Sequence, residues 1–98
     1  MIDLRSDTVT KPSKEMLQAM YEAEVGDDVY GEDPTINKLE KEFSELLGKD
    51  RAVFMTSGTQ SNLSAILSHC GRGEEMIVGN VDHTALDEAA GASVLGGI

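Results

Sequence analysis

The tripeptide Ser57-Gly58-Thr59 is the part of this 98-residue sequence whose residue types and spacing best suit the binding of a phosphate group. It stands between an apolar run and a helical stretch, which places its backbone N–H groups at a helix N-terminus. Such groups lack partners and lie at the positive end of the helix dipole. Gly58 lets a ligand approach the backbone closely, and the two hydroxyls can donate further hydrogen bonds. Taken alone, however, the tripeptide favours an ordinary helix cap over a phosphate site.

The residues around this turn exclude two common nucleotide-binding motifs. No Gly-Lys-Ser or Gly-Lys-Thr follows, so the turn is not a Walker loop. The second and third glycines of the dinucleotide fingerprint are also missing. His69 and Cys70 follow near the end of the next helix, where we expect both to pack, and we predict no metal site.

The elements that precede the turn are predicted from apolar spacing and from helix start and stop signals. Residues 1–12 predict an extended arm, and residues 13–24 predict a helix with one apolar stripe. After a loop of turn-forming residues, Asp33 and Pro34 predict the start of a second helix. Gly48 is expected to end it.

Apolar runs alternate with helical stretches in the second half of the chain. The helical stretches run from the turn to about Cys70 and from 84 to 90, and strands are predicted for 51–56, 75–79 and 93–95. This β-α-β-α-β order is typical of an α/β fold, a parallel sheet with helices on both faces. The strands are apolar nearly throughout, as doubly covered strands should be.

We predict a division of the chain into residues 1–48, an arm with two helices, and residues 49–98, the start of an α/β domain. The last predicted strand would leave the sheet with an unpaired edge. It runs into Leu95-Gly96-Gly97-Ile98, which carries no polar tail. We therefore expect the sequence to be cut from a longer one.

Composition and charge exclude several classes of function. The formal net charge is −10, with no basic run, which argues against nucleic-acid and anionic-membrane partners. The single cysteine rules out an internal disulfide and fits a reducing compartment. The charged N-terminus does not read as a signal peptide, and no apolar run approaches the roughly 20 residues of a membrane span. We expect a cytoplasmic protein.

Blocks of sequence along the whole chain resemble the threonine aldolases. The closest type is the low-specificity L-threonine aldolase, within the β-eliminating lyase and aldolase group of fold-type I pyridoxal-phosphate enzymes. The matching blocks are Ile2 to Thr10 with Pro12, Val25 to Pro34, Ser57-Gly58-Thr59 with Asn62, Ser68-His69-Cys70 with Arg72-Gly73-Glu74-Glu75, and His83 with Glu88-Ala89-Ala90-Gly91.

This resemblance implies a fold, a cofactor and a reaction. The fold is the large domain of the aspartate aminotransferase type, and the cofactor is pyridoxal 5'-phosphate joined to a lysine as a Schiff base. The reaction is the cleavage of L-threonine or L-allo-threonine to glycine and acetaldehyde, in which the cofactor ring accepts electrons when Cα–Cβ breaks. The resemblance also implies a homotetramer whose active sites lie between subunits.

The resemblance assigns roles to six residues. Gly58 and Thr59 match the phosphate contacts, with Ser57 as a helper. His83 matches the histidine that stacks on the pyridine ring, and its ordinary pKa also suits a shuttle for the substrate hydroxyl proton. The substrate contacts are expected from Ser6, near the amino-acid carboxylate, and from Tyr30, which lines its own pocket or a neighbouring subunit's.

One departure from the family pattern follows His83. Family members commonly carry aromatic residues in the next turn, where this chain has Thr84, Ala85, Leu86 and Asp87. Asp87 is four residues after His83 and shares its helical face. If this turn faces the cofactor, we expect Asp87 to pair with His83 and raise its pKa. The change leaves open a bulkier or more polar β-hydroxy amino acid as substrate.

The Schiff-base lysine, the acid that pairs with the pyridine nitrogen and the arginine that clamps the substrate carboxylate are all expected beyond residue 98. The chain's own lysines lie on arms, helix surfaces or a turn, and none fits the role. We therefore expect the 98 residues to be inactive by themselves. Two alternatives stay open: another fold-type I lyase with a different amino-acid substrate, and a non-catalytic module that uses this region for binding or assembly.

Overall fold

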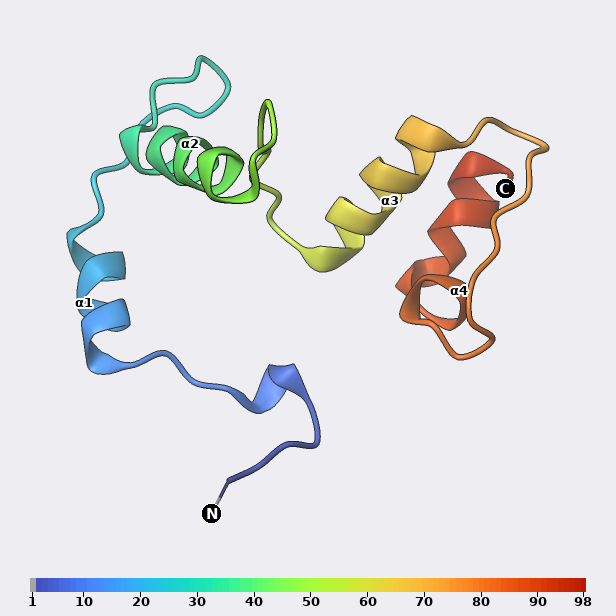
Figure 1. Cartoon of the computed structure of the whole chain (residues 1–98), viewed down its shortest axis with the longest axis horizontal. Helices are drawn as coiled ribbons and strands as arrows, with labels where there is room; N and C mark the ends of the chain where they lie inside the picture. The colour runs from blue at the N-terminus through green and yellow to red at the C-terminus, as the bar shows by residue number, and fades with distance from the viewer. Residues whose placement is uncertain (1) are drawn as a thin grey trace. The chain divides into compact units, whose positions relative to one another are not determined.

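The computed structural model describes residues 2–98, and these form two compact units with the boundary between Val53 and Phe54. Figure 1 traces the helices along the chain from blue to red. None of the helices within the described range has the length and apolar character that a membrane crossing requires.

The first unit contains a short 3₁₀ turn and two α-helices, and both helices begin where the sequence predicts. The 3₁₀ turn η1 spans Asp7–Val9, α1 spans Lys14–Glu22 and α2 spans Pro34–Leu47. The Ser13 side chain caps α1 by accepting from the backbone N–H of Met16. α2 ends at Gly48, whose left-handed backbone (φ 60°) suits a residue without a Cβ.

Asp33 closes the loop between these two helices. One carboxylate oxygen caps α2 by accepting from Ile36 N–H at 2.9 Å, and the other accepts from Gly26 N–H at 3.0 Å. These two bonds hold the pKa of Asp33 below its ordinary value. Gly26 lies so close to the opposite side of the loop that a Cβ would collide with the Glu32 carbonyl. The loop is therefore built around one carboxylate and one glycine.

The second unit contains α3 (Gly58–His69), α4 (His83–Leu86), a 3₁₀ turn η2 (Glu88–Ala90) and a π-helix η3 (Ala92–Gly96). The π-helix packs beside α3, where Figure 1 shows the red segment next to the yellow helix. The contact uses two buried glycines: a Cβ on Gly91 would press on Leu63, and one on Gly96 would collide with Leu67 and Ile98. α3 confirms the helix predicted from the turn at Ser57 to about Cys70.

The predicted β-α-β-α-β pattern is not confirmed, because residues 2–98 contain no strand. Residues 51–55 and 75–79 run without regular secondary structure, and the third predicted strand, 93–95, lies inside η3. The predicted short helix 84–90 is also wrong in part, because α4 ends at Leu86. A strand satisfies its N–H and C=O groups only on a neighbouring strand, whereas a helix satisfies them within its own segment.

No hydrophobic side chain is buried anywhere in the described range. Most apolar residues of the predicted strands are exposed, and Ile77 is fully exposed at 101%. Burial of apolar surface is the main force that drives folding, so these residues on their own lack the usual source of stability. The helices are held by their caps and local hydrogen bonds.

Candidate functional site

The turn before α3 is a fully formed helix cap. The Ser57 hydroxyl accepts from Gln60 N–H at 3.1 Å. The Gln60 side chain reaches back, and its Oε1 accepts from both the backbone N–H and the hydroxyl of Thr56, at 3.1 and 2.8 Å. This reciprocal arrangement resembles a capping box and fixes the direction in which the chain enters the helix.

The cap leaves two backbone donors free for a ligand. The N–H groups of Gly58 and Thr59 lie in the first turn of α3, where no acceptor of the helix can reach them. A Cβ built on Gly58 would meet nothing within 4 Å, so a ligand can approach Gly58 from its Cβ side. The Thr59 hydroxyl likewise makes no hydrogen bond within residues 2–98. The turn therefore serves as a helix cap through Ser57 and still offers an anion two amides and a hydroxyl.

His83 begins α4, and its ring is held by an acidic side chain from the next turn. Nδ1 of His83 lies 2.8 Å from Oε1 of Glu88. The imidazole is 69% exposed, whereas the Glu88 side chain is 7% exposed. The hydrogen bond to Glu88 is the main cause that raises the pKa of His83 above its ordinary value, and the same bond lowers the pKa of Glu88. The exposed ring is thus anchored on a sheltered carboxylate.

Asn62 joins this pair to α3. Its Nδ2 donates to the same Glu88 oxygen at 2.8 Å. Asn62 lies about one helical turn after the Ser57 cap. Two hydrogen bonds to Oε1 of Glu88 therefore connect α3 to the ring of His83.

The predicted pairing of Asp87 with His83 is present, although it is the lesser of two acidic contacts. Oδ2 of Asp87 lies 3.9 Å from Nε2 of His83, and the Asp87 side chain is 63% exposed. Its charge contributes to the raised pKa of His83, after the hydrogen bond to Glu88. The two carboxylates thus approach opposite nitrogens of the ring.

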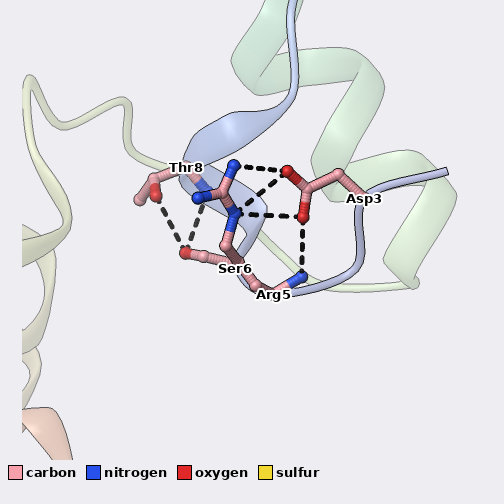
Figure 2. A network of polar contacts seen from close by, with 4 residues as sticks. All are labelled: Asp3, Arg5, Ser6 and Thr8. Atoms are coloured by element: carbon pink, nitrogen blue, oxygen red, sulfur yellow. Dashed lines mark hydrogen bonds and ion pairs between the residues drawn. The ribbon is translucent and has the colours of Figure 1, made fainter. Parts of the chain in front are cut away.

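Ser6 and Tyr30, the predicted substrate contacts, lie in the first unit. The Ser6 hydroxyl caps η1: it accepts from Thr8 N–H at 3.2 Å and lies 2.8 Å from the Thr8 hydroxyl. Beside it, Arg5 and Asp3 form an ion pair that lowers the pKa of Asp3 (Figure 2). Tyr30 is 79% exposed on the loop that Asp33 closes. The turn at Ser57 and His83 belong to the second unit.

Sequence reasoning gave no role to Glu88 and Asn62, although both stand in the blocks that carry the resemblance. Helical spacing pointed to Asp87, because i and i+4 share a face. A residue at i+5 is about 140° away around a regular helix, at 100° per residue. Glu88 reaches His83 only because the backbone leaves the helix, and no periodic signal predicts that.

Within residues 2–98, no three His, Cys, Asp or Glu side chains are grouped as a metal site requires.

Comparisons with known proteins agree with one another on the family of this chain. Residues 3–98 match the family model of the beta-eliminating lyases. The whole chain is 63% identical to a low specificity L-threonine aldolase of Escherichia coli, over 98 residues that make up 29% of that relative.

More distant relatives carry similar names. A probable low-specificity L-threonine aldolase of Arabidopsis thaliana is 53% identical over 98 residues, which cover 99% of this chain and 28% of the relative. A low specificity L-threonine aldolase of Saccharomyces cerevisiae is 43% identical over 94 residues, which cover 95% of this chain and 24% of the relative. The chain thus spans less than a third of the length of these relatives.

Proposed function

The chain belongs to the beta-eliminating lyase family, and from that premise we propose that it is part of a pyridoxal-phosphate-dependent aldolase. The reaction proposed for the full-length protein is the cleavage of L-threonine and L-allo-threonine to glycine and acetaldehyde. The relatives named as threonine aldolases support the substrate class. The observation that carries the proposal is the open N-terminus of α3, tied through Asn62 and Glu88 to the ring of His83.

The donors at the start of α3 suit the phosphate end of pyridoxal phosphate. Within the described residues the amides of Gly58 and Thr59 have no helical acceptor, and together with the Thr59 hydroxyl they supply donors of the kind that bind a phosphate dianion. We assign the phosphate to Gly58 and Thr59, with Ser57 as cap and helper. When bound, this cofactor supplies a ring that accepts the electrons released as the Cα–Cβ bond breaks.

His83 is assigned to the cofactor ring and to the substrate hydroxyl. An ionised carboxylate only accepts hydrogen bonds, so Nδ1 must be the donor to Glu88. In the neutral imidazole, Nε2 then carries the free lone pair and can take the hydroxyl proton of a β-hydroxy amino acid. The large exposed fraction of the ring leaves room for both the cofactor and the substrate.

The remaining sequence-based predictions belong to the full-length protein. We propose that residues 51–56 and 75–79 pair there as parallel strands of an aminotransferase-like large domain, with a boundary near residue 48. The exposed apolar side chains of these segments support pairing, whereas the π-helical 93–95 gives the third strand no support. A homotetramer, with Ser6 and Tyr30 in substrate-binding positions, completes the proposal.

The 98 residues alone are proposed to be inactive. Two of the lysines, Lys38 and Lys41, form ion pairs with Glu42 and Glu45 on the surface of α2. The others are Lys11 and Lys14, at the start of α1, and Lys49, just after α2. All five therefore lie on an arm, on a helix surface or at a turn, and we assign the Schiff base to none of them.

A panel of substrates tests this function. The full-length protein is assayed for aldehyde release from L-threonine, L-allo-threonine and phenylserine, with and without added pyridoxal phosphate. Cleavage of both threonine isomers that depends on the cofactor supports the proposal. Cleavage of neither isomer, by a protein shown to bind the cofactor, contradicts it.

Asp87 favours one second candidate, a fold-type I lyase whose β-hydroxy amino acid is more polar than threonine. Its carboxylate lies 3.9 Å from Nε2 of His83, on the side proposed for the substrate hydroxyl. A charged group there would attract a substrate that carries an extra hydrogen-bond donor. In the substrate panel, faster cleavage of a polar substrate than of threonine would support this candidate.

A further inference from the structure

We propose that Glu88 is a positioning residue that holds the imidazole of His83 in one orientation and one tautomer, and that fastens it to α3 through Asn62. The catalytic meaning of this role rests on the proposed function, in which His83 acts on the substrate hydroxyl. The hydrogen-bonded arrangement itself can be tested without any activity.

Glu88 and His83 differ in the hydrogen bonds that they make and in their exposure to solvent. Oε1 of Glu88 accepts from Nδ1 of His83 and from Nδ2 of Asn62, both at 2.8 Å. The carboxylate is almost fully sheltered, whereas the imidazole is mostly open. A hydrogen bond to an ionised group is about twice as strong as a neutral one, and shelter from water strengthens it further. Glu88 therefore fixes the imidazole of His83, while the ring itself stays accessible to a ligand.

The backbone supplies an independent observation. Glu88, Ala89 and Ala90 all have positive φ, at 56°, 54° and 51°. The left-handed region is unfavourable for a residue with a Cβ, because the Cβ comes too close to the following carbonyl oxygen. Strain of this kind persists only where surrounding contacts fix it, and it gathers at functional positions. If α4 had continued as a regular helix, residue 88 would have pointed away from His83. The left-handed turn brings it to the ring instead.

The surroundings of His83 leave Glu88 as the dominant acidic neighbour. Asp87 approaches the other ring nitrogen at 3.9 Å from an exposed position. α3 contributes the neutral amide of Asn62, and its one titratable residue, His69, lies seven positions further along the helix. η3 carries no titratable side chain. The orientation of the ring is thus set by one contact.

Two substitutions in the full-length protein separate the charge of Glu88 from its hydrogen bonds. Glu88→Gln keeps an oxygen that can accept from both partners but removes the charge. Glu88→Ala removes both bonds. The matched control is Asp87→Asn, which removes a neighbouring carboxylate that does not contact Nδ1. The readout is the nitrogen chemical shifts of the His83 ring across a pH titration, assigned by comparison with a His83→Asn variant.

We expect the wild-type neutral ring to be the Nδ1–H tautomer, and Asp87→Asn to retain it. Glu88→Gln should also retain it but lower the pKa of His83 more than Asp87→Asn does. Glu88→Ala should lose the tautomer preference and lower threonine cleavage roughly 10–100-fold, as when partners that orient metal-binding histidines are removed. Pyridoxal phosphate content and circular dichroism confirm that each variant is folded.

Two results separate the failure of this inference from the failure of the proposed function. If folded Glu88→Ala keeps the wild-type tautomer and pKa of His83, Glu88 does not position the ring and the inference is overturned. If wild type cleaves no threonine but the ring shifts respond as expected, Glu88 does position the ring and only the proposed function fails.

Discussion

Nδ1 of His83 lies 2.8 Å from Oε1 of Glu88, across a left-handed turn and not along the face of a helix. This relationship raises the pKa of the histidine and lowers the pKa of the glutamate. It also decides which ring nitrogen is free for chemistry.

The His83–Glu88 pair should make stability depend on pH in a defined window. A raised histidine pKa means that its contribution is complete below the ordinary value of 6.5 and is lost as pH rises through the folded value. The lowered glutamate pKa means that its contribution is lost as pH falls below about 4.5. In thermal melts of the full-length protein, the Tm difference between wild type and Glu88→Gln should be largest between these values. A difference that stays constant to pH 9 would contradict this account.

Ala90→Gly should stabilise the protein, because Ala90 has a φ of 51°. Relief of the left-handed strain gains roughly 1–2 kcal/mol, and the extra backbone freedom of glycine offsets about 0.5–1 kcal/mol of it. The expected net gain is thus about 0.5–1 kcal/mol. The matched control is Ala85→Gly in the right-handed α4, which should lose stability by about 0.5–1 kcal/mol. Denaturant titration measures both, and two changes of the same sign would refute the left-handed turn.

Gly26→Ala should open the loop between α1 and α2, because its new Cβ would collide with the carbonyl of Glu32. Forcing an extra carbon into a close-packed position costs typically about 1–3 kcal/mol. The backbone amide of residue 26 donates to Asp33, and its hydrogen exchange should become faster in the variant. Gly71→Ala is the control, since its Cβ would meet only Glu74 at an ordinary 3.7 Å. Equal effects from both substitutions would rule out the proposed close approach.

Ser57→Ala and Thr59→Ala should have different effects on the turn before α3. The Ser57 hydroxyl is committed to capping Gln60 N–H, so its loss should cost about 1 kcal/mol of stability. The Thr59 hydroxyl makes no hydrogen bond within the described residues, so its loss should mainly weaken the binding of pyridoxal phosphate. Thermal melts without cofactor and a cofactor titration separate the two effects. A large stability loss with Thr59→Ala and unchanged cofactor affinity would contradict the assigned roles.

Local signals in the sequence predicted the helix starts well. Asp33 before Pro34, and Ser57 before Gly58, each supply a side chain that satisfies a free N–H of the helix. Such caps act within three residues, so they can be recognised without knowledge of the rest of the fold. Gly48 is the equivalent signal at a helix end, because only a residue without a Cβ adopts its backbone at little cost.

The strands and the Glu88 contact could not be predicted with the same security. A strand depends on a partner that is distant in the sequence, and residues 51–56 and 75–79 find none within the described range. The turn at Glu88 is held by contacts that outweigh local preference, because three successive residues with a Cβ adopt positive φ. Helical spacing therefore found Asp87 and missed the stronger partner of His83.

The release of acetaldehyde by the full-length protein tests the central claim most directly. The protein is freed of pyridoxal phosphate, supplied with L-threonine, and assayed as the cofactor is added back. Our account predicts no acetaldehyde at first, an increase that saturates with bound cofactor, and a weaker response in Thr59→Ala. Acetaldehyde release at full rate without cofactor, or none once the cofactor is bound, would contradict it.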